Sequence, residues 1–137
     1  MFFNQVIGQK KLVAQLKRSQ NLSNFSHSSI FIDSNSYGGL SIALSVALSL
    51  LYEETFLFNE LKKGKKIFQF YENPDLIYLF PLPDSKSKSS DYYKDWLSFI
   101  QNTPYNNVND WINLISSGNK QGNISVENVE SIIYSLN

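Results

Sequence analysis

The chain has 137 residues, and its 12 Lys and Arg balance its 12 Asp and Glu, so the formal net charge is zero. This balance excludes a general electrostatic attraction to nucleic acid or to an anionic membrane, so any DNA contact must be local. The absence of Cys and the presence of only one His exclude disulfides, thiolate nucleophiles and the usual zinc sites.

Residues 5–18 predict an amphipathic helix that is interrupted near Gly8, with apolar residues on one face and lysines on the other. The N-terminus lacks the pattern of a signal peptide, and the most apolar run, residues 40–51, is too short and too rich in serine for a membrane span. We therefore expect a single compact domain that is cytoplasmic and has no membrane partner.

The next three segments predict a strand, a loop and a helix in succession. Residues 28–32 form a β-branched and aromatic run, residues 33–39 are rich in turn residues, and residues 40–52 are apolar nearly all round. The first run predicts a strand and the last predicts a buried helix. This order is typical of an α/β unit.

The second half of the chain predicts one more strand and then helices. Residues 75–80 read as a buried strand that ends at Pro81. Helical spacing of apolar residues then predicts helices over 92–100 and 107–116, and Ser125 is expected to cap a last amphipathic helix.

The loop over residues 33–40 has the place of a phosphate-binding loop but lacks its chemistry. The working pattern G-x-x-x-x-G-K-[ST] uses backbone N–H groups and a Lys to hold phosphates, and a hydroxyl to hold Mg²⁺. Here Asp33 replaces the first Gly, Gly39 replaces the Lys and Leu40 replaces the Ser or Thr, which leaves Gly38 alone in register. The degenerate loop comprises Asp33, Ser34, Asn35, Ser36, Tyr37, Gly38, Gly39 and Leu40.

An Asp in this loop adds like-charge repulsion to polyphosphate, and no Lys or Arg occurs over residues 19–61 to offset it. We therefore expect no ATP hydrolysis, no catalytic residue, no metal and no cofactor. The alternative is that Gly38 and Gly39 simply form a turn before a helix.

Several motifs, spread along nearly the whole chain, resemble one known family. The segment 6–9 is similar to the V-x-G-Q start of clamp loader AAA+ subunits, 27–32 is similar to their first strand, and 73–76 is similar to their H-P-D-[LI] segment with Asn73 in place of His. The most specific segments are Trp96-Leu97-Ser98-Phe99-Ile100, Pro104-Tyr105, Asp110-Trp111 and Asn119-Lys120-Gln121-Gly122-Asn123-Ile124. Together they resemble the delta-prime subunit of the bacterial DNA polymerase III clamp loader.

This resemblance implies that residues 1–137 are the N-terminal part of an AAA+ (RecA-like) P-loop domain, an α/β fold of parallel strands and flanking helices. The resemblance ends before the Walker B strand, and we expect the lid and collar domains of the family to be absent. Because residues 30–32 would then lack their neighbouring strands, we expect a fragment, a decayed gene product or a unit that another chain completes.

The same resemblance implies a non-hydrolysing structural subunit of DNA polymerase III that supports sliding-clamp loading in DNA replication. Its partners would be the gamma/tau and delta types of subunit, with indirect contact to the sliding clamp and primed DNA. A small P-loop-derived nucleotide-binding protein, or a decayed product without a function, stays open as an alternative.

Other candidate residues have a structural reading beside a functional one. Lys62, Lys63, Lys65 and Lys66 form a local patch that could contact DNA or a partner, although a solvated loop explains the run as well. His27 has no catalytic partner in view, so we expect it to be structural. The aromatic residues with helical spacing are expected in a core or a subunit interface before base stacking. They are Tyr92, Tyr93, Trp96 and Trp111.

Overall fold

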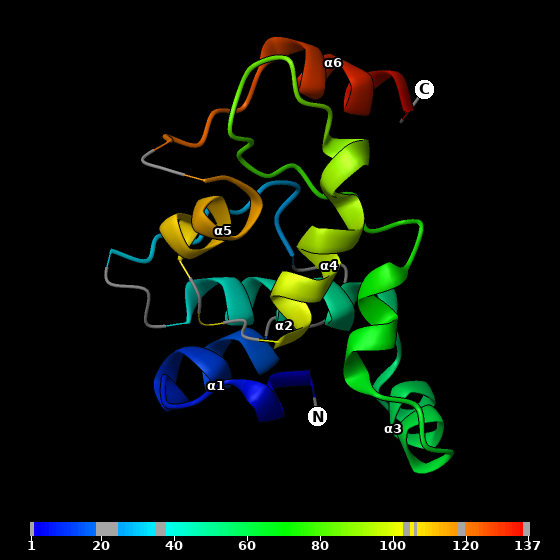
Figure 1. Ribbon diagram of the computed structural model, residues 1–137. Coiled ribbons are helices and arrows are strands. Elements are labelled where there is room, and N and C mark those ends of the chain that lie inside the picture. Colours follow the sequence, from blue (N-terminus) through cyan, green and yellow to red (C-terminus); the bar gives the residue numbers. More distant parts are fainter. Residues whose placement is uncertain are drawn as a thin grey trace. The chain divides into compact units, whose positions relative to one another are not determined.

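The computed structural model describes residues 2–18, 25–34, 38–102, 105, 107–117 and 120–135, without the side chains of Gln5 and Ser135. The chain divides into two compact units, Met1–Asp75 and Leu76–Asn137, which are described one at a time (Figure 1). In the described residues of both units, the regular structure is helical.

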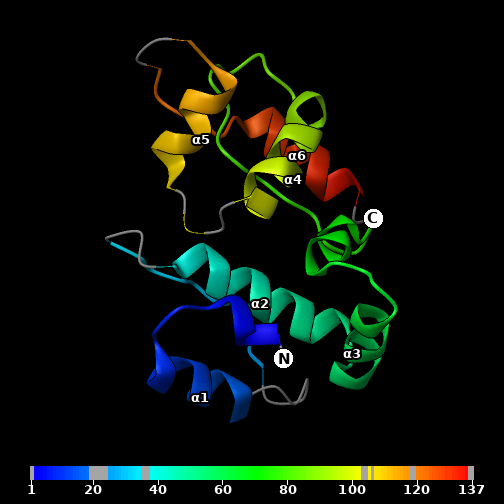
Figure 2. The same cartoon turned by 60° about the horizontal axis from the view of Figure 1, so that its bottom comes forward.

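The first unit is organised around the helix α2. Its elements are η1 (Phe2–Gln5), α1 (Lys10–Arg18), α2 (Gly39–Leu51), α3 (Glu54–Lys62) and η3 (Ile67–Glu72). Both η1 and η3 pack against α2. Figure 2 shows α2 running through the middle of this unit, with α1 to one side and α3 beyond its C-terminal end.

The helix α2 confirms the prediction of a buried apolar helix. Ser41 and Ser45 are buried and Ser49 is half-buried, and the hydroxyls of Ser45 and Ser49 hydrogen-bond to the backbone of the same helix. Ser45 Oγ donates to the carbonyl of Ser41 at 2.8 Å, and Ser49 Oγ donates to the carbonyl of Val46 at 2.7 Å. The buried apolar side chains of α2 are Ile42, Leu44, Val46 and Leu48.

The predicted interruption of the first helix near Gly8 is also confirmed. Gly8 has φ 79° and Gln9 has φ 48°, and these left-handed conformations separate η1 from α1. Gln9 then provides the carbonyl that accepts the first helical hydrogen bond, from Val13 N at 2.9 Å. The N-terminal region is therefore two short helical pieces.

The second unit contains η4 (Ser89–Tyr92), α4 (Tyr93–Asn102), α5 (Val108–Ile115) and α6 (Val126–Ser135). These bounds confirm the three helices predicted in this half of the chain. Ser125 caps α6 as expected, because its Oγ accepts a hydrogen bond from Asn128 N at 3.3 Å. Leu82 and Asn123 form an isolated antiparallel bridge with two backbone hydrogen bonds of 2.8 Å.

An aromatic cluster forms the core of the second unit. The ring of Trp96 stacks on the ring of Phe80, with centroids 4.7 Å apart. The ring of Trp111 packs edge to face against both, with its centroid 5.1 Å from that of Trp96 and 5.3 Å from that of Phe80. Trp111 Nε1 donates to the carbonyl of Pro81 at 2.7 Å, which satisfies this buried donor. Trp96 and Trp111 therefore lie in a core, as predicted. Tyr92 and Tyr93 are half-buried.

The predicted α/β fold with parallel strands is wrong, because the described residues contain no strand. Both predicted strands, residues 28–32 and 75–80, lack a ladder. An apolar run becomes a strand only when a neighbour supplies hydrogen bonds, and neither run has such a neighbour in the described chain. The AAA+ P-loop architecture that the resemblance implies is therefore not the fold of these residues.

The described helices have at most 13 residues, whereas a helix that crosses a bilayer needs about 20. None of them alone is long and apolar enough to cross a membrane. The pair α2 and α3 meets the length and composition criteria only when both are taken together, across a bend of 102°.

Candidate functional site

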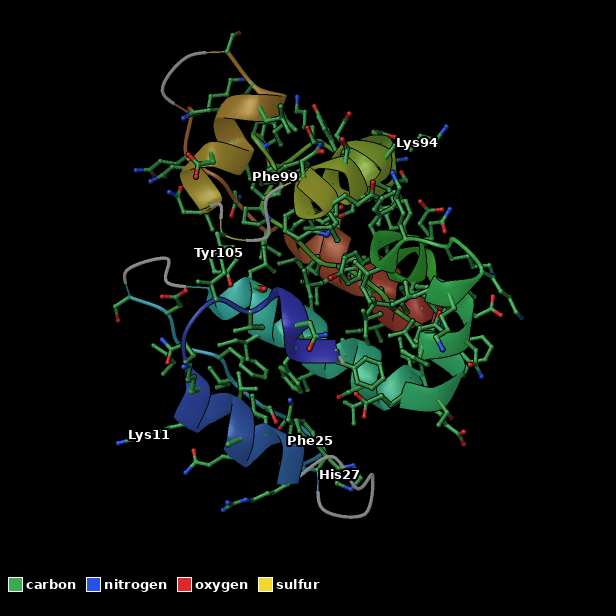
Figure 3. All side chains as sticks on the ribbon, turned by 90° about the horizontal axis from the view of Figure 1, so that it is seen from below. Lys11, Phe25, His27, Lys94, Phe99 and Tyr105 are labelled. Atoms are coloured by element: carbon green, nitrogen blue, oxygen red, sulfur yellow. The ribbon has the colours of Figure 1, made fainter. Side chains whose placement is uncertain are left out.

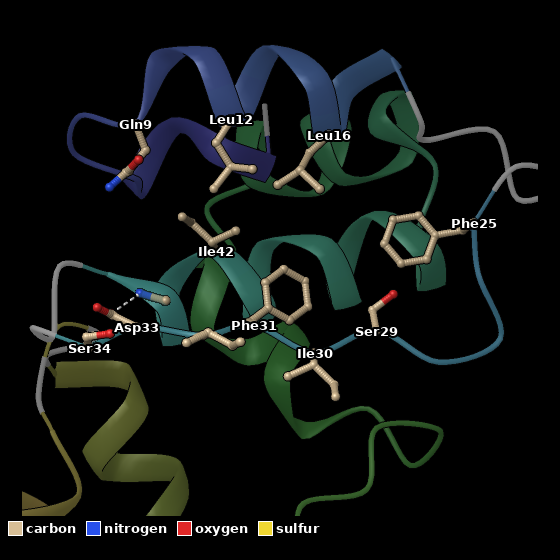
Figure 4. A pocket seen from close by; sticks show the side chains of 12 residues that line it. Gln9, Leu12, Leu16, Phe25, Ser29, Ile30, Phe31, Asp33, Ser34 and Ile42 are labelled. Atoms are coloured by element: carbon tan, nitrogen blue, oxygen red, sulfur yellow. Dashed lines mark hydrogen bonds between the residues drawn. The ribbon is translucent and has the colours of Figure 1, made fainter.

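The loop before α2 is closed by the carboxylate of Asp33. Its Oδ2 accepts a hydrogen bond of 2.7 Å from Gly39 N, at the first residue of the helix (Figure 4). The preceding residue, Gly38, has no side chain to cap the helix. Because the first N–H groups of a helix have no partner within it, Asp33 supplies the acceptor that the N-cap position lacks.

Both glycines of the turn are explained by this arrangement. Gly38 has φ 104°, a left-handed conformation that favours glycine. A Cβ on Gly39 would lie 2.6 Å from Asp33 Cβ and 3.0 Å from its Oδ2, so this side chain leaves no room for one. Asp33, Gly38 and Gly39 are therefore one local unit, a carboxylate-capped turn.

The carboxylate of Asp33 lies where a phosphate-binding loop would hold its anion. A helix N-terminus attracts negative charge through its free N–H groups and its dipole, and Asp33 already provides a negative charge there. Leu40, at the position of the Mg²⁺-holding hydroxyl, is a half-buried apolar side chain. Asn35, Ser36 and Tyr37 lie outside the described residues, whereas Ser34 is exposed.

A cavity of about 580 Å³ lies beside this turn, between α1, residues 25–34 and the start of α2. Figure 4 shows Leu12 and Leu16 of α1 facing Phe31 and Ile42 across it. Asp33 is the one charged residue among those that line the cavity. The walls therefore suit apolar groups, and they offer no pairing of a nucleophile with a base.

The predicted lysine patch is held by an acid that sequence reasoning overlooked. Glu60, in the last turns of α3, pairs with Lys63 at 2.7 Å through Oε1 and with Lys65 through Oε2. These two hydrogen bonds lower the pKa of Glu60 to about 2. The spacing of Glu60 and Lys63, three residues apart, was the signal in the sequence.

The remaining two lysines of the patch lie over aromatic rings. Lys62 Nζ is 4.3 Å from the ring centroid of Phe58, and Lys66 Nζ is 5.7 Å from that of Phe68. Such contacts orient the amines and leave their charge in place. Since the carboxylate of Glu60 offsets part of the positive charge, the patch is weaker than its sequence suggests, and contact with DNA or a partner stays a prediction.

His27 lies exposed near Phe25 at the start of the segment 25–34 (Figure 3). Among the residues that the structure describes, no group of three or more His, Asp or Glu side chains is arranged to hold a metal ion. The turn closed by Asp33, with the adjoining cavity, is therefore the candidate functional site.

Comparison with protein-family models, with curated proteins and with solved structures finds no match for this chain. The resemblance to clamp loader subunits accordingly depends on the sequence motifs alone. The activity and the partners that it implies stay predictions.

Proposed function

We propose that the chain is a non-hydrolysing structural subunit that works by contact with other subunits of the DNA polymerase III clamp loader. The motifs at residues 96–100, 104–105, 110–111 and 119–124 support the choice of this assembly. The parallel sheet that the resemblance implies is not part of this proposal, because the described residues form none.

The observation that carries the proposal is the hydrogen bond of 2.7 Å between Asp33 Oδ2 and Gly39 N. A triphosphate would have to displace this carboxylate from the helix start, and no Lys or Arg in residues 19–61 would replace the lost interaction. Such a turn is suited to holding its own shape and not to holding a nucleotide.

Titration calorimetry with ATP and Mg²⁺ tests the non-hydrolysing part of the proposal. We expect no binding at millimolar nucleotide and no turnover for the wild-type chain. Asp33→Asn is the matched variant, because it keeps an acceptor at the same place and removes the charge. Micromolar binding by the wild type that Gly39→Val abolishes would instead identify a small nucleotide-binding protein.

Reconstitution with the other clamp loader subunits encoded in the same genome tests the partner. We expect the chain to co-purify with gamma/tau-type and delta-type subunits in a complex of defined mass, measured by native mass spectrometry. The gamma/tau and delta types mixed without this chain provide the control. Failure of the chain to enter any complex, while the other subunits assemble, would overturn the assignment to this assembly.

A further inference from the structure

Residues 28–32 expose two isoleucines and a stretch of backbone that has no backbone partner among the described residues. No backbone hydrogen bond joins these residues to the rest of the described chain. Ile30 and Ile32 are 88% and 87% exposed, whereas Phe31 is only 38% exposed. All three residues border the cavity. Figure 4 shows Ile30 and Phe31 pointing to opposite sides of a nearly straight segment. The rest of the unit therefore covers much of the Phe31 side chain, whereas the side chains of Ile30 and Ile32 are open to solvent.

The pattern specifies an extended partner and not a helical one. A helix satisfies its own main-chain groups, so it would leave the N–H and C=O groups of residues 28–32 without protein partners. A strand pairs with them directly, and a β-branched and aromatic run such as Ile30-Phe31-Ile32 is well suited to a ladder. An unpaired edge of this kind is a template for another chain.

We propose that this segment pairs with the same segment of a second copy, in an antiparallel ladder centred on Phe31. In this register Phe31 faces its own equivalent, Ile30 faces Ile32 of the second copy, and Ser29 faces Asp33 of the second copy. Ile30 and Ile32 exchange all four central hydrogen bonds, and their exposed side chains become cross-strand neighbours. Such a contact is isologous and closes after two copies.

The charges favour this orientation over the parallel one. In a parallel in-register ladder Asp33 would lie opposite Asp33 of the second copy, and like charges directly opposite each other are destabilising. In the antiparallel register each carboxylate faces the neutral Ser29, so its bond to Gly39 N need not break. The zero net charge of the chain adds no overall repulsion between two copies.

A ladder of five residues on each chain buries far less than the roughly 1,600 Å² of a standard stable interface. We therefore expect a weak dimer whose population rises with protein concentration. This contact goes beyond the proposed function, because it holds whether or not the chain enters a clamp loader.

Analytical ultracentrifugation over roughly 10 µM to 1 mM protein measures the association, a range chosen for an interface below the standard size. Ile30→Pro removes an N–H used by the ladder and should weaken the dimer at least about tenfold. Ser29→Pro is the matched control, since its N–H points to the opposite edge, and it should leave the dimer unchanged. A chain that stays monomeric throughout, or a dimer that Ile30→Pro leaves intact, would overturn the proposal.

Cysteine cross-linking tests the register, because the natural chain has no Cys. Phe31→Cys should form an intermolecular disulfide quickly, since facing residues in a non-hydrogen-bonded pair have Cα atoms about 4.5 Å apart. A mixture of Ile30→Cys and Ile32→Cys should cross-link faster than either variant alone, and it leaves Phe31 in place. Ser26→Cys, exposed but far from the centre, is the control. Equal cross-linking rates at all positions would refute this register. Protection of the Ile30 and Ile32 amides from hydrogen exchange in a monomer would also refute it.

Discussion

Replacement of Asp33 by Ala should destabilise the unit Met1–Asp75 by about 1 kcal/mol, the typical value for a lost N-terminal cap. The change removes the acceptor 2.7 Å from Gly39 N and leaves the start of α2 to water. Asp33→Asn keeps an acceptor and loses the interaction of the charge with the helix dipole, so it should cost only about 0.3–1 kcal/mol. The free energy of unfolding should therefore increase in the order Asp33→Ala, Asp33→Asn, wild type.

Urea unfolding followed by circular dichroism at the helical band measures this effect. With a slope of about 1 kcal/mol per molar urea for a small unit, Asp33→Ala should lower the midpoint by roughly 1 M. Tryptophan fluorescence provides a parallel probe of Leu76–Asn137, because both Trp residues lie there. Equal midpoints for the wild type and Asp33→Ala, with unchanged slopes, would refute the capping role of this carboxylate.

Three further predictions concern other contacts. Trp111→Phe should cost about 0.5–1.5 kcal/mol because the half-buried carbonyl of Pro81 loses its hydrogen bond of 2.7 Å. Trp96→Phe removes a buried Nε1 that has no hydrogen-bond partner in the described chain, so it should cost less, and urea midpoints compare the two variants. The pKa of Glu60 is lowered from 4.5 to about 2, so its ion pairs contribute stability that is present above pH 4.5 and is lost as the pH falls toward 2. In acid titrations followed by circular dichroism, the free energies of unfolding of the wild type and Glu60→Gln should therefore converge below pH 2. Ser125→Ala should lower the stability of the second unit by about 1 kcal/mol in the same urea assay, since α6 loses its cap.

The α-helices other than α3 were predictable because their signals are local. The serine stripe and apolar residues of α2 identified a buried helix, and Ser125 marked the start of α6. The two predicted strands were wrong, because residues 28–32 and 75–80 carry strand composition but have no neighbouring strand among the residues that the structure describes. The helix α3 escaped notice because only Leu57 and Glu60 of its nine residues are buried, so it has little apolar periodicity.

The candidate site was predictable in its chemistry and not in its geometry. The sequence shows that Asp33 replaces a glycine and that the lysine is missing, and both argue against phosphate. It does not show that the carboxylate bonds to Gly39 N six residues later, because a contact across a loop depends on how that loop closes. The pairing of Glu60 with Lys65 depends in the same way on the turn at Gly64, which has φ 94°.

Two features weaken triphosphate binding at the turn, and their sizes can be compared. Displacement of the Asp33 carboxylate costs about 0.5–2 kcal/mol, or roughly 2- to 30-fold in affinity. The absent lysine forfeits charge-assisted hydrogen bonds worth about 1.5–3 kcal/mol, or roughly 10- to 150-fold. Because the missing lysine is the larger effect, Asp33→Asn alone should not restore ATP binding. A carboxylate that already fills the helix start instead stabilises the shape of the turn, which is the property that a subunit acting by contact requires.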